Sequence, residues 1–143
     1  MKKILIINGP NLNKLGEREL SIYGNKSLES IKIECQSYTN KLDLTFFQTN
    51  SESDIVDCIQ KAEKIFLGIV INAAAYTHTS IAIHDSLKMV NIPIIEVHLS
   101  NLYKREDFRQ KSFISPLADG IIIGLGSDVY KIAIKAMELK LEK

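Results

Sequence analysis

Residues able to exchange protons or bind an anion gather at three places in this 143-residue sequence, each at the end of a short apolar run. The runs are residues 3–7, 68–72 and 94–97. Side chains at these places offer amides, imidazoles, guanidiniums and a phenol, but no obvious nucleophile with an adjacent base. The candidates are Asn8, Asn11, Asn13, Arg18, Tyr23, Asn72, Tyr76, His78, Glu96, His98, Ser100, Arg105 and Arg109.

This set of residue types suits proton transfer beside a carbonyl group. Such a reaction needs a base for a carbon-bound proton, a donor for the enolate, and an acid for a leaving hydroxyl. Tyrosine is a poor base at its ordinary pKa of about 10, but a neighbouring arginine favours the phenolate. Arg18 and Tyr23 share one segment, so this pairing is feasible. From spacing alone, a solvated Arg18 and a packed Tyr23 remain the simpler interpretation.

Other chemistries fit the sequence less well. His78, His84 and His98 do not have a recognised zinc spacing, so no metal or cofactor is expected. Glycines at 124 and 126 precede a helix start where backbone N–H groups could hold an anion, but the full dinucleotide motif is absent and a tight turn is favoured. A phosphorelay receiver needs acidic residues in the places where asparagines stand.

Five apolar, β-branched runs alternate with segments of helical periodicity. This pattern predicts an α/β fold, a flavodoxin-like doubly wound sandwich with a five-stranded parallel sheet, in a single domain over residues 1–143. The predicted strands are 3–7, 44–49, 68–72, 94–97 and 120–124.

Serines mark the starts of the predicted helices. Ser27 is expected to cap a helix whose apolar positions include Ile31, Cys35, Tyr38 and Leu42. The other three helices are predicted to begin at Ser51 or Ser53, to run over 80–90, and to begin at Ser127 or Asp128. Cys35 and Cys58 fall on or near apolar helix faces and are interpreted as packing residues.

Two connections are longer than compact domains usually need, residues 9–26 and 98–119. Both begin at carboxyl ends of predicted strands, where open α/β sheets bind ligands. The sequence therefore predicts that the candidate side chains converge at this edge of the sheet.

Composition limits the classes of partner that this protein can have. Eighteen Lys and Arg against seventeen Asp and Glu give a formal net charge of +1, which argues against nucleic-acid binding. The longest apolar runs are far shorter than the roughly 20 residues of a membrane span. Only four apolar residues follow the amino-terminal lysines, fewer than the roughly 7–15 of a signal peptide. A cytoplasmic protein is expected.

Three long motifs make the sequence resemble the type II 3-dehydroquinate dehydratases. Residues 9–24 (GPNLNKLGERELSIYG) resemble the opening of that family, residues 71–80 (INAAAYTHTS) its second block, and residues 96–109 (EVHLSNLYKREDFR) its third. The blocks occur in family order. The resemblance implies a flavodoxin-like fold, conversion of 3-dehydroquinate to 3-dehydroshikimate plus water in the shikimate pathway, no metal or imine, and a dodecamer built from trimers.

The resemblance also implies catalytic roles. Tyr23 would take the proton from C2 of the substrate, and Arg18 would favour its phenolate. Asn11 would hold a water that stabilises the enolate. His98 would protonate the departing C1 hydroxyl, and Glu96 would orient it.

Substrate-binding roles follow from the same match. Asn72, His78 and Arg109 would bind ring hydroxyls, while Ser100 and the backbone N–H of Leu99 would take the carboxylate. Asp85 would reach the site of a neighbouring subunit.

The sequence departs from the usual family pattern at positions that carry none of the catalytic matches: Lys14, Leu20, Ala73, His84 and Val129. His84 stands beside Asp85 and bears on the subunit contact, while Lys14 and Leu20 bear on the active-site lid. A non-catalytic flavodoxin-like module that binds a small ligand or partner is the alternative.

Overall fold

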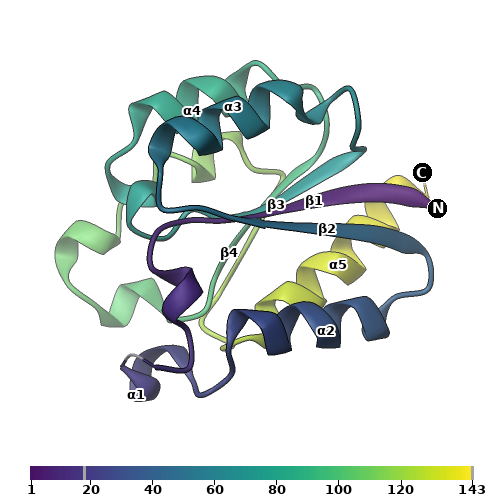
Figure 1. The fold of residues 1–143 in the computed structure, drawn as a ribbon. Helices are drawn as coiled ribbons and strands as arrows, with labels where there is room; N and C mark the ends of the chain where they lie inside the picture. The colour runs from purple at the N-terminus through teal and green to yellow at the C-terminus, as the bar shows by residue number, and fades with distance from the viewer. Residues whose placement is uncertain (18, 143) are drawn as a thin grey trace.

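The computed structural model describes residues 1–17 and 19–142, and in these residues it contains a five-stranded parallel sheet (Figure 1). The strand order is β2-β1-β3-β4-β5. The strands are β1 (Lys2–Asn8), β2 (Leu42–Gln48), β3 (Gly68–Asn72), β4 (Ile94–His98) and β5 (Gly120–Ile123).

Helices cover both faces of this sheet, as predicted (Figure 1). One face carries α2 (Leu28–Tyr38) and α5 (Asp128–Leu141), and the other carries α3 (Glu52–Ala62) and α4 (Ile81–Lys88). Each face has its own buried core. Strand β1 serves both cores because its side chains alternate: Ile4 and Ile6 belong to one core, and Leu5 and Ile7 to the other.

Serine caps begin three of the helices, as the sequence predicts. Ser27 Oγ accepts a hydrogen bond from the backbone N–H of Ser30 over 3.1 Å. Ser51, and not Ser53, caps α3, and Ser80 caps α4. Each hydroxyl satisfies a backbone donor that has no carbonyl partner within its helix.

The predicted end of the first long helix is wrong. Helix α2 ends at Tyr38 because Thr39 has extended backbone angles, and Leu42 is a buried residue at the start of β2. Tyr38 is 51% exposed and contributes little to the core. Helical spacing alone could not show that the chain leaves the helix between these two apolar residues.

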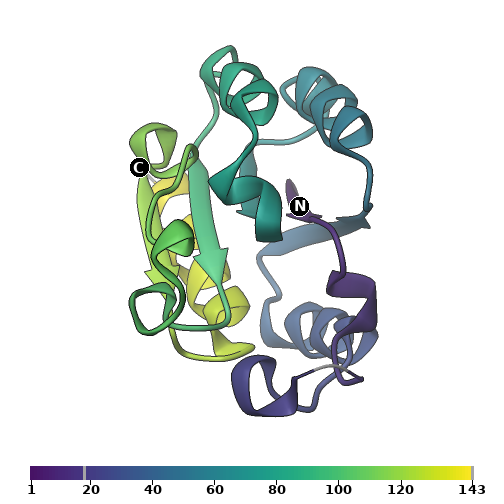
Figure 2. The ribbon, with the colours of Figure 1, turned by 90° about the vertical axis from the view of Figure 1, so that its left-hand side faces the viewer.

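The long connections contain short helices at the carboxyl edge of the sheet (Figure 2). The first holds a 3₁₀ turn (Leu12–Lys14) and α1 (Leu20–Tyr23). A second 3₁₀ turn, over Ala74–His78, follows β3. After β4 come three 3₁₀ turns, Leu102–Lys104, Asp107–Arg109 and Ser115–Leu117.

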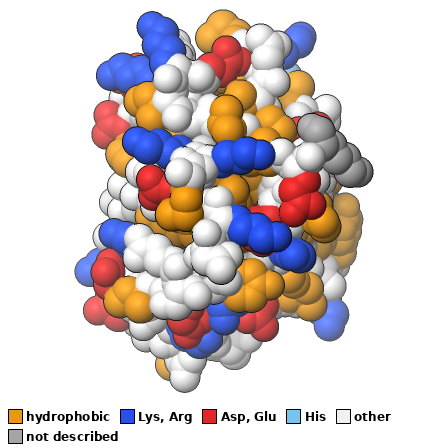
Figure 3. Space-filling model, turned by 90° about the vertical axis from the view of Figure 1, so that its right-hand side faces the viewer, with side chains coloured by type: hydrophobic (Ala, Val, Ile, Leu, Met, Phe, Trp, Pro, Cys, Tyr) orange, Lys and Arg blue, Asp and Glu red, His pale blue; other side chains and the backbone are white. Residues whose placement is uncertain are grey.

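The amino terminus and the last turn of α5 lie at the opposite edge, where the strands begin (Figure 1). On that face, acidic and basic side chains are mixed with apolar ones (Figure 3). Within the described part of the chain, no helix is long and apolar enough to cross a membrane.

Candidate active site

A pocket opens at the carboxyl edge of the sheet, where the long connections meet. Its empty space is about 570 Å³ including the open mouth, within the range of small-molecule sites. Nine of the residues singled out from the sequence line it: Asn11, Tyr23, Asn72, His78, His98, Leu99, Ser100, Arg105 and Arg109. Pro10, Leu12, Ala74, Ala75 and Leu102 complete the lining.

Asn11 is held by a neighbouring loop in a backbone conformation that few residues adopt. Its φ is 69°, in the left-handed region that asparagine tolerates better than most residues. Asn50 Oδ1 accepts the Asn11 N–H over 3.0 Å, and Tyr76 Oη donates to the Asn50 carbonyl over 2.8 Å. Gly9 lets this loop approach β3, because a Cβ there would lie 2.4 Å from the Ala73 carbonyl oxygen.

Asn72 is fixed from beneath by a buried hydrogen-bond chain. Asn8 and Asn72 are paired at the ends of adjacent strands, with side chains toward the face that α5 covers. Asn72 Nδ2 donates to Tyr130 Oη over 3.1 Å, and Tyr130 Oη donates to Asn8 Oδ1 over 2.5 Å. Burial raises the pKa of the Tyr130 phenol, which keeps it protonated and able to donate.

Glu96 and His98 form a buried pair at the end of β4. They are two residues apart, so they point to the same face of the sheet. His98 Nε2 lies 2.6 Å from Glu96 Oε2, and the two side chains are 5% and 1% exposed. Burial raises the pKa of Glu96, but hydrogen bonds from His98, Ser115 and Ser112 outweigh it and hold the pKa below its usual value.

His78 lies beside His98, with ring centroids 6.3 Å apart. Its Nδ1 donates to the Lys111 carbonyl over 2.8 Å, which directs Nε2 away from that carbonyl. Burial lowers the pKa of His78, as do the charges of His98 and Arg109, although the Lys111 carbonyl opposes the shift. His78 is therefore a neutral hydrogen-bonding group near pH 7.

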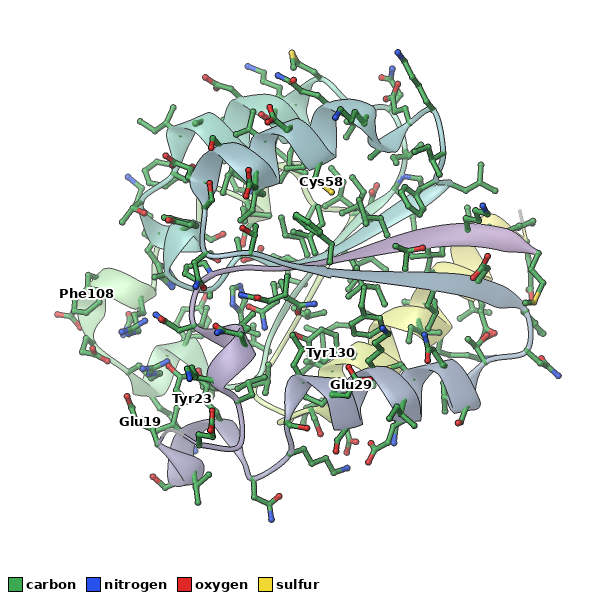
Figure 4. All side chains as sticks on the ribbon, viewed as in Figure 1. Glu19, Tyr23, Glu29, Cys58, Phe108 and Tyr130 are labelled. Atoms are coloured by element: carbon green, nitrogen blue, oxygen red, sulfur yellow. The ribbon has the colours of Figure 1, made fainter. Side chains whose placement is uncertain are left out.

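Tyr23 extends from α1 into the pocket, whereas Phe108 lies at the outer tip of the molecule (Figure 4). The Arg105 guanidinium carbon lies 5.1 Å from the centroid of the Tyr23 ring, and its Nη1 donates to Ser100 Oγ over 3.4 Å. A permanent cation thus joins the phenol to the end of β4. Arg18, the predicted partner of Tyr23, lies outside the described residues.

Comparison with known proteins identifies this arrangement. Residues 2–138 match the family model of class II dehydroquinases. The 3-dehydroquinate dehydratase of Prochlorococcus marinus is 52% identical over 136 residues, 94% of each chain, and that of Nitratiruptor sp. is 53% identical over 94% of this chain and 88% of the other. The type II dehydroquinase of Butyrivibrio crossotus superposes with a TM-score of 0.93 at 44% identity, covering 96% and 97% of the two chains.

The chain belongs to the class II dehydroquinase family. The family resemblance and the flavodoxin-like fold expected from the sequence are therefore confirmed. The predicted turn at 124–126 is also present, since Gly124 and Gly126 have φ values of 90° and 61° between β5 and α5. It contacts the site through Gly126 N–H, which donates to the Leu99 carbonyl.

Two of the predicted site residues lie off the pocket in this family member. Glu96 lies behind His98, consistent with an orienting role. Asp85 is exposed on α4 and does not line the pocket of its own chain, as far as the described residues show. Neighbouring His84 donates from Nδ1 to the Phe113 carbonyl over 2.5 Å, so the departure at position 84 fastens a loop of its own chain.

The supporting residues of the site are those that sequence reasoning missed. They are Asn50, Tyr130, Ser112 and Ser115, which hold Asn11, Asn72 and Glu96 in place. Tyr130 occupies an ordinary core position of an amphipathic helix, and the two serines lie in a loop, so no local pattern distinguishes them. Their roles become visible only in the folded structure, where they form hydrogen bonds with the site residues.

The cysteines are packing residues, as predicted. Cys35 is buried, and desolvation raises its pKa to about 11; Cys58 is half-buried and its pKa is also raised by burial. Neither thiol is activated as a nucleophile. Among the described residues, no group of three or more His, Cys, Asp or Glu side chains is arranged to hold a metal ion.

Proposed function

We propose that this protein is a 3-dehydroquinate dehydratase of the shikimate pathway, using Tyr23 as base and His98 as acid in an anti elimination through an enolate. The observation that carries the proposal is the convergence of a phenol and an imidazole in one pocket, within a chain of the class II dehydroquinase family. The imidazole is backed by an ionised carboxylate and the phenol is covered by a guanidinium.

The elimination balances with these two groups alone. The Tyr23 phenolate takes the proton from C2, and the electron pair moves into the carbonyl to give an enolate. A water held by Asn11 stabilises the enolate oxygen. As the enolate collapses, the C1–O bond breaks, His98 gives its proton to the departing hydroxyl, and water leaves. Arg105 stabilises the phenolate, and Arg18 is assigned the same task from the sequence.

The atom of His98 that donates the proton follows from its partner. Because Nε2 lies against the Glu96 carboxylate, that nitrogen keeps its hydrogen in both charge states. The proton for the leaving hydroxyl therefore comes from Nδ1. The same hydrogen bond fixes the orientation of the ring, so that Nδ1 is the nitrogen left to face the substrate.

The remaining pocket residues suit a small polyhydroxylated anion. Asn72, His78 and Arg109, which line the pocket, would bind ring hydroxyls, while Ser100 and the Leu99 N–H would take the carboxylate. Neutral hydrogen-bonding groups that are already oriented lose little entropy when such a ligand binds. A non-catalytic binding module would not need a phenol and an imidazole with these two distinct supports.

We also propose that the working unit is an oligomer of trimers, in keeping with a dodecamer, in the cytoplasm. Asp85 is exposed on α4, near Ile81, which is 59% exposed. A subunit contact there would bury apolar surface and bring the Asp85 carboxylate to a neighbouring pocket. Light scattering that shows the active protein to be a monomer at the concentration of the assay would contradict this assembly.

The function is tested by adding 3-dehydroquinate to the purified protein and following the ultraviolet absorbance of the conjugated enone product. We expect turnover that survives a chelator and is not trapped by borohydride, because the proposed steps use neither a metal ion nor an imine. A protein that binds the substrate without forming the enone would instead support the binding module. Reductive trapping of a lysine would contradict the enolate mechanism.

A further inference from the structure

The segment from Lys111 to Ser115 lies against Glu96 and supplies two of the three side-chain donors to its carboxylate. Ser112 Oγ donates to Oε2 over 2.9 Å, and Ser115 Oγ donates to Oε1 over 2.5 Å. The third donor is His98 Nε2. Each oxygen of the Glu96 carboxylate therefore accepts a hydrogen bond from one serine. The two serines lie 16 and 19 residues after Glu96 in the sequence.

The fold determines where this segment lies. The Phe113 N–H donates to the Thr77 carbonyl over 2.9 Å, and His84 Nδ1 donates to the Phe113 carbonyl. Ile114 is fully buried in the core between the sheet and the α3–α4 layer. Phe113 and Ile114, which lie between the two serines, are therefore held against α4 and the turn that precedes it. The serine hydroxyls on either side consequently have little freedom to move.

The two serines differ in what else they hold. Ser112 Oγ also accepts from the backbone N–H groups of Ile114 and Ser115, each over 3.0 Å, so it shapes the turn as well. The Ser115 hydroxyl donates to the Glu96 carboxylate. Substitution of Ser115 therefore tests the carboxylate contact most directly.

A carboxylate as deeply buried as Glu96 remains ionised only if donors replace the lost water. Titratable and charged groups face it from β4, where His98 binds it, and from the Ala74–His78 turn, where its charge raises the pKa of His78. Arg109 acts on His78 in the opposite sense. The serines add two neutral donors that favour the ionised form at every pH.

We propose that Ser112 and Ser115 are positioning residues for the acid step, which hold Glu96 ionised and oriented so that His98 presents a protonated Nδ1 to the substrate. This inference rests on the proposed function, in which His98 is the acid. Neither serine is among the described residues that line the pocket, so both act through Glu96.

The test is the pH profile of kcat for Ser115→Ala, with Thr39→Val as the matched control. Glu96 must be ionised, so activity is lost as the pH falls through its pKa. Without the Ser115 donor that pKa rises, and the acid limb should move upward by about one pH unit, the scale of one hydrogen bond to a charged group. Activity on the plateau should fall while KM changes little, because the pocket lining is intact.

The control removes a hydroxyl of the same kind at the opposite edge of the sheet. Thr39 Oγ1 donates to the Glu138 carboxylate over 3.4 Å, and valine keeps the shape of the side chain. Thr39→Val should leave the acid limb unchanged. Ser115→Cys, which offers a weaker donor, should give a shift between those of the parent and Ser115→Ala.

An unmoved acid limb in Ser115→Ala, or a loss of kcat that is equal at every pH, would overturn the proposal. If Ser115→Ala does not fold, Ser115→Cys decides by the same criteria. The free energy of unfolding in urea, measured against pH, gives a readout without turnover: its acid-side decrease should be smaller in the variant and should end at higher pH, because the folded-state pKa of Glu96 lies closer to its unfolded value. If the parent protein forms no enone, the proposed function fails, and this unfolding measurement still tests whether the serines keep Glu96 ionised.

Discussion

The two residues proposed to move protons, His98 and Tyr23, are held by very different parts of the molecule. His98 ends a central strand, is 4% exposed, and is bound to a carboxylate that has two further donors. Tyr23 ends the four-residue helix α1, is only half-buried, and lies between Gly16 and Gly24, which both have positive φ.

This difference shows that one side of the pocket is rigid and orients a catalytic group, whereas the other side can open to admit the substrate. The acid is built into the sheet, where buried strands hold its position before any substrate arrives. The base lies on a segment with few buried residues, which is the kind of structure that opens at low free-energy cost. A segment of this kind can admit the substrate and then complete the site by closing over it.

Tyr23→Phe should have the largest effect, because it removes the base while keeping the ring beneath Arg105. We expect kcat to fall by about 10²–10⁴-fold, the range of a single general base, with substrate binding largely intact. Turnover and equilibrium binding of 3-dehydroquinate would be measured separately. Turnover close to that of the parent would show that Tyr23 is not the base and would redirect the search to His78.

Glu96→Gln should lower kcat on the order of 10²-fold, because a neutral amide binds the His98 ring more weakly than a carboxylate does. The pH dependence of unfolding sharpens this result. Since the folded-state pKa of Glu96 is depressed, its stabilising contribution is complete above the ordinary value of about 4.3 and is lost as the pH falls through the lower folded value. The variant should lack this acid-side loss; an unchanged urea-denaturation profile against pH would exclude an ionised Glu96.

Tyr130→Phe should affect binding more than chemistry. It leaves the buried Asn8 Oδ1 and Asn72 Nδ2 without their shared hydroxyl, at a cost of about 1–3 kcal/mol in the free energy of unfolding. KM should rise several-fold because the Asn72 amide loses its fixed orientation. Tyr103→Phe, at a side chain that is 68% exposed, is the control, and equal stability of the two variants would count against the buried hydrogen-bond chain.

Gly24→Ala should have the smallest effect. It tests whether the segment that carries Tyr23 opens locally, without unfolding of the core. Gly24 has φ 82° and ψ 179°, a conformation that costs other residues about 1–3 kcal/mol, although a Cβ would meet no atom within 4 Å. If the segment opens locally, it releases this strain without unfolding the core, so the melting temperature should barely change while kcat falls a few-fold. A decrease in global stability matching the full strain would show that the segment unfolds only with the rest of the molecule.

The sequence predicted most of this structure because its signals are local. Near-continuous apolar runs predicted five strands, with β3 at its observed bounds, and Ser27, Ser51 and Ser80 marked helix starts. The position of polar residues after strands predicted where they would meet, and eight of them line the pocket. The end of α2 was mispredicted because Leu42 continues the helical spacing into the next strand.

Residue types and their order along the chain therefore determined the fold class, the edge that carries the site and the groups available for chemistry. Tertiary structure alone decided which groups support which. Asn8 and Tyr130 are 122 positions apart, and the serines that bind Glu96 come from a separate loop. Hydrogen bonds act over about 3 Å, so their partners are fixed by packing and not by spacing in the sequence. The charge state of Glu96 and the nitrogen that His98 presents follow from those contacts.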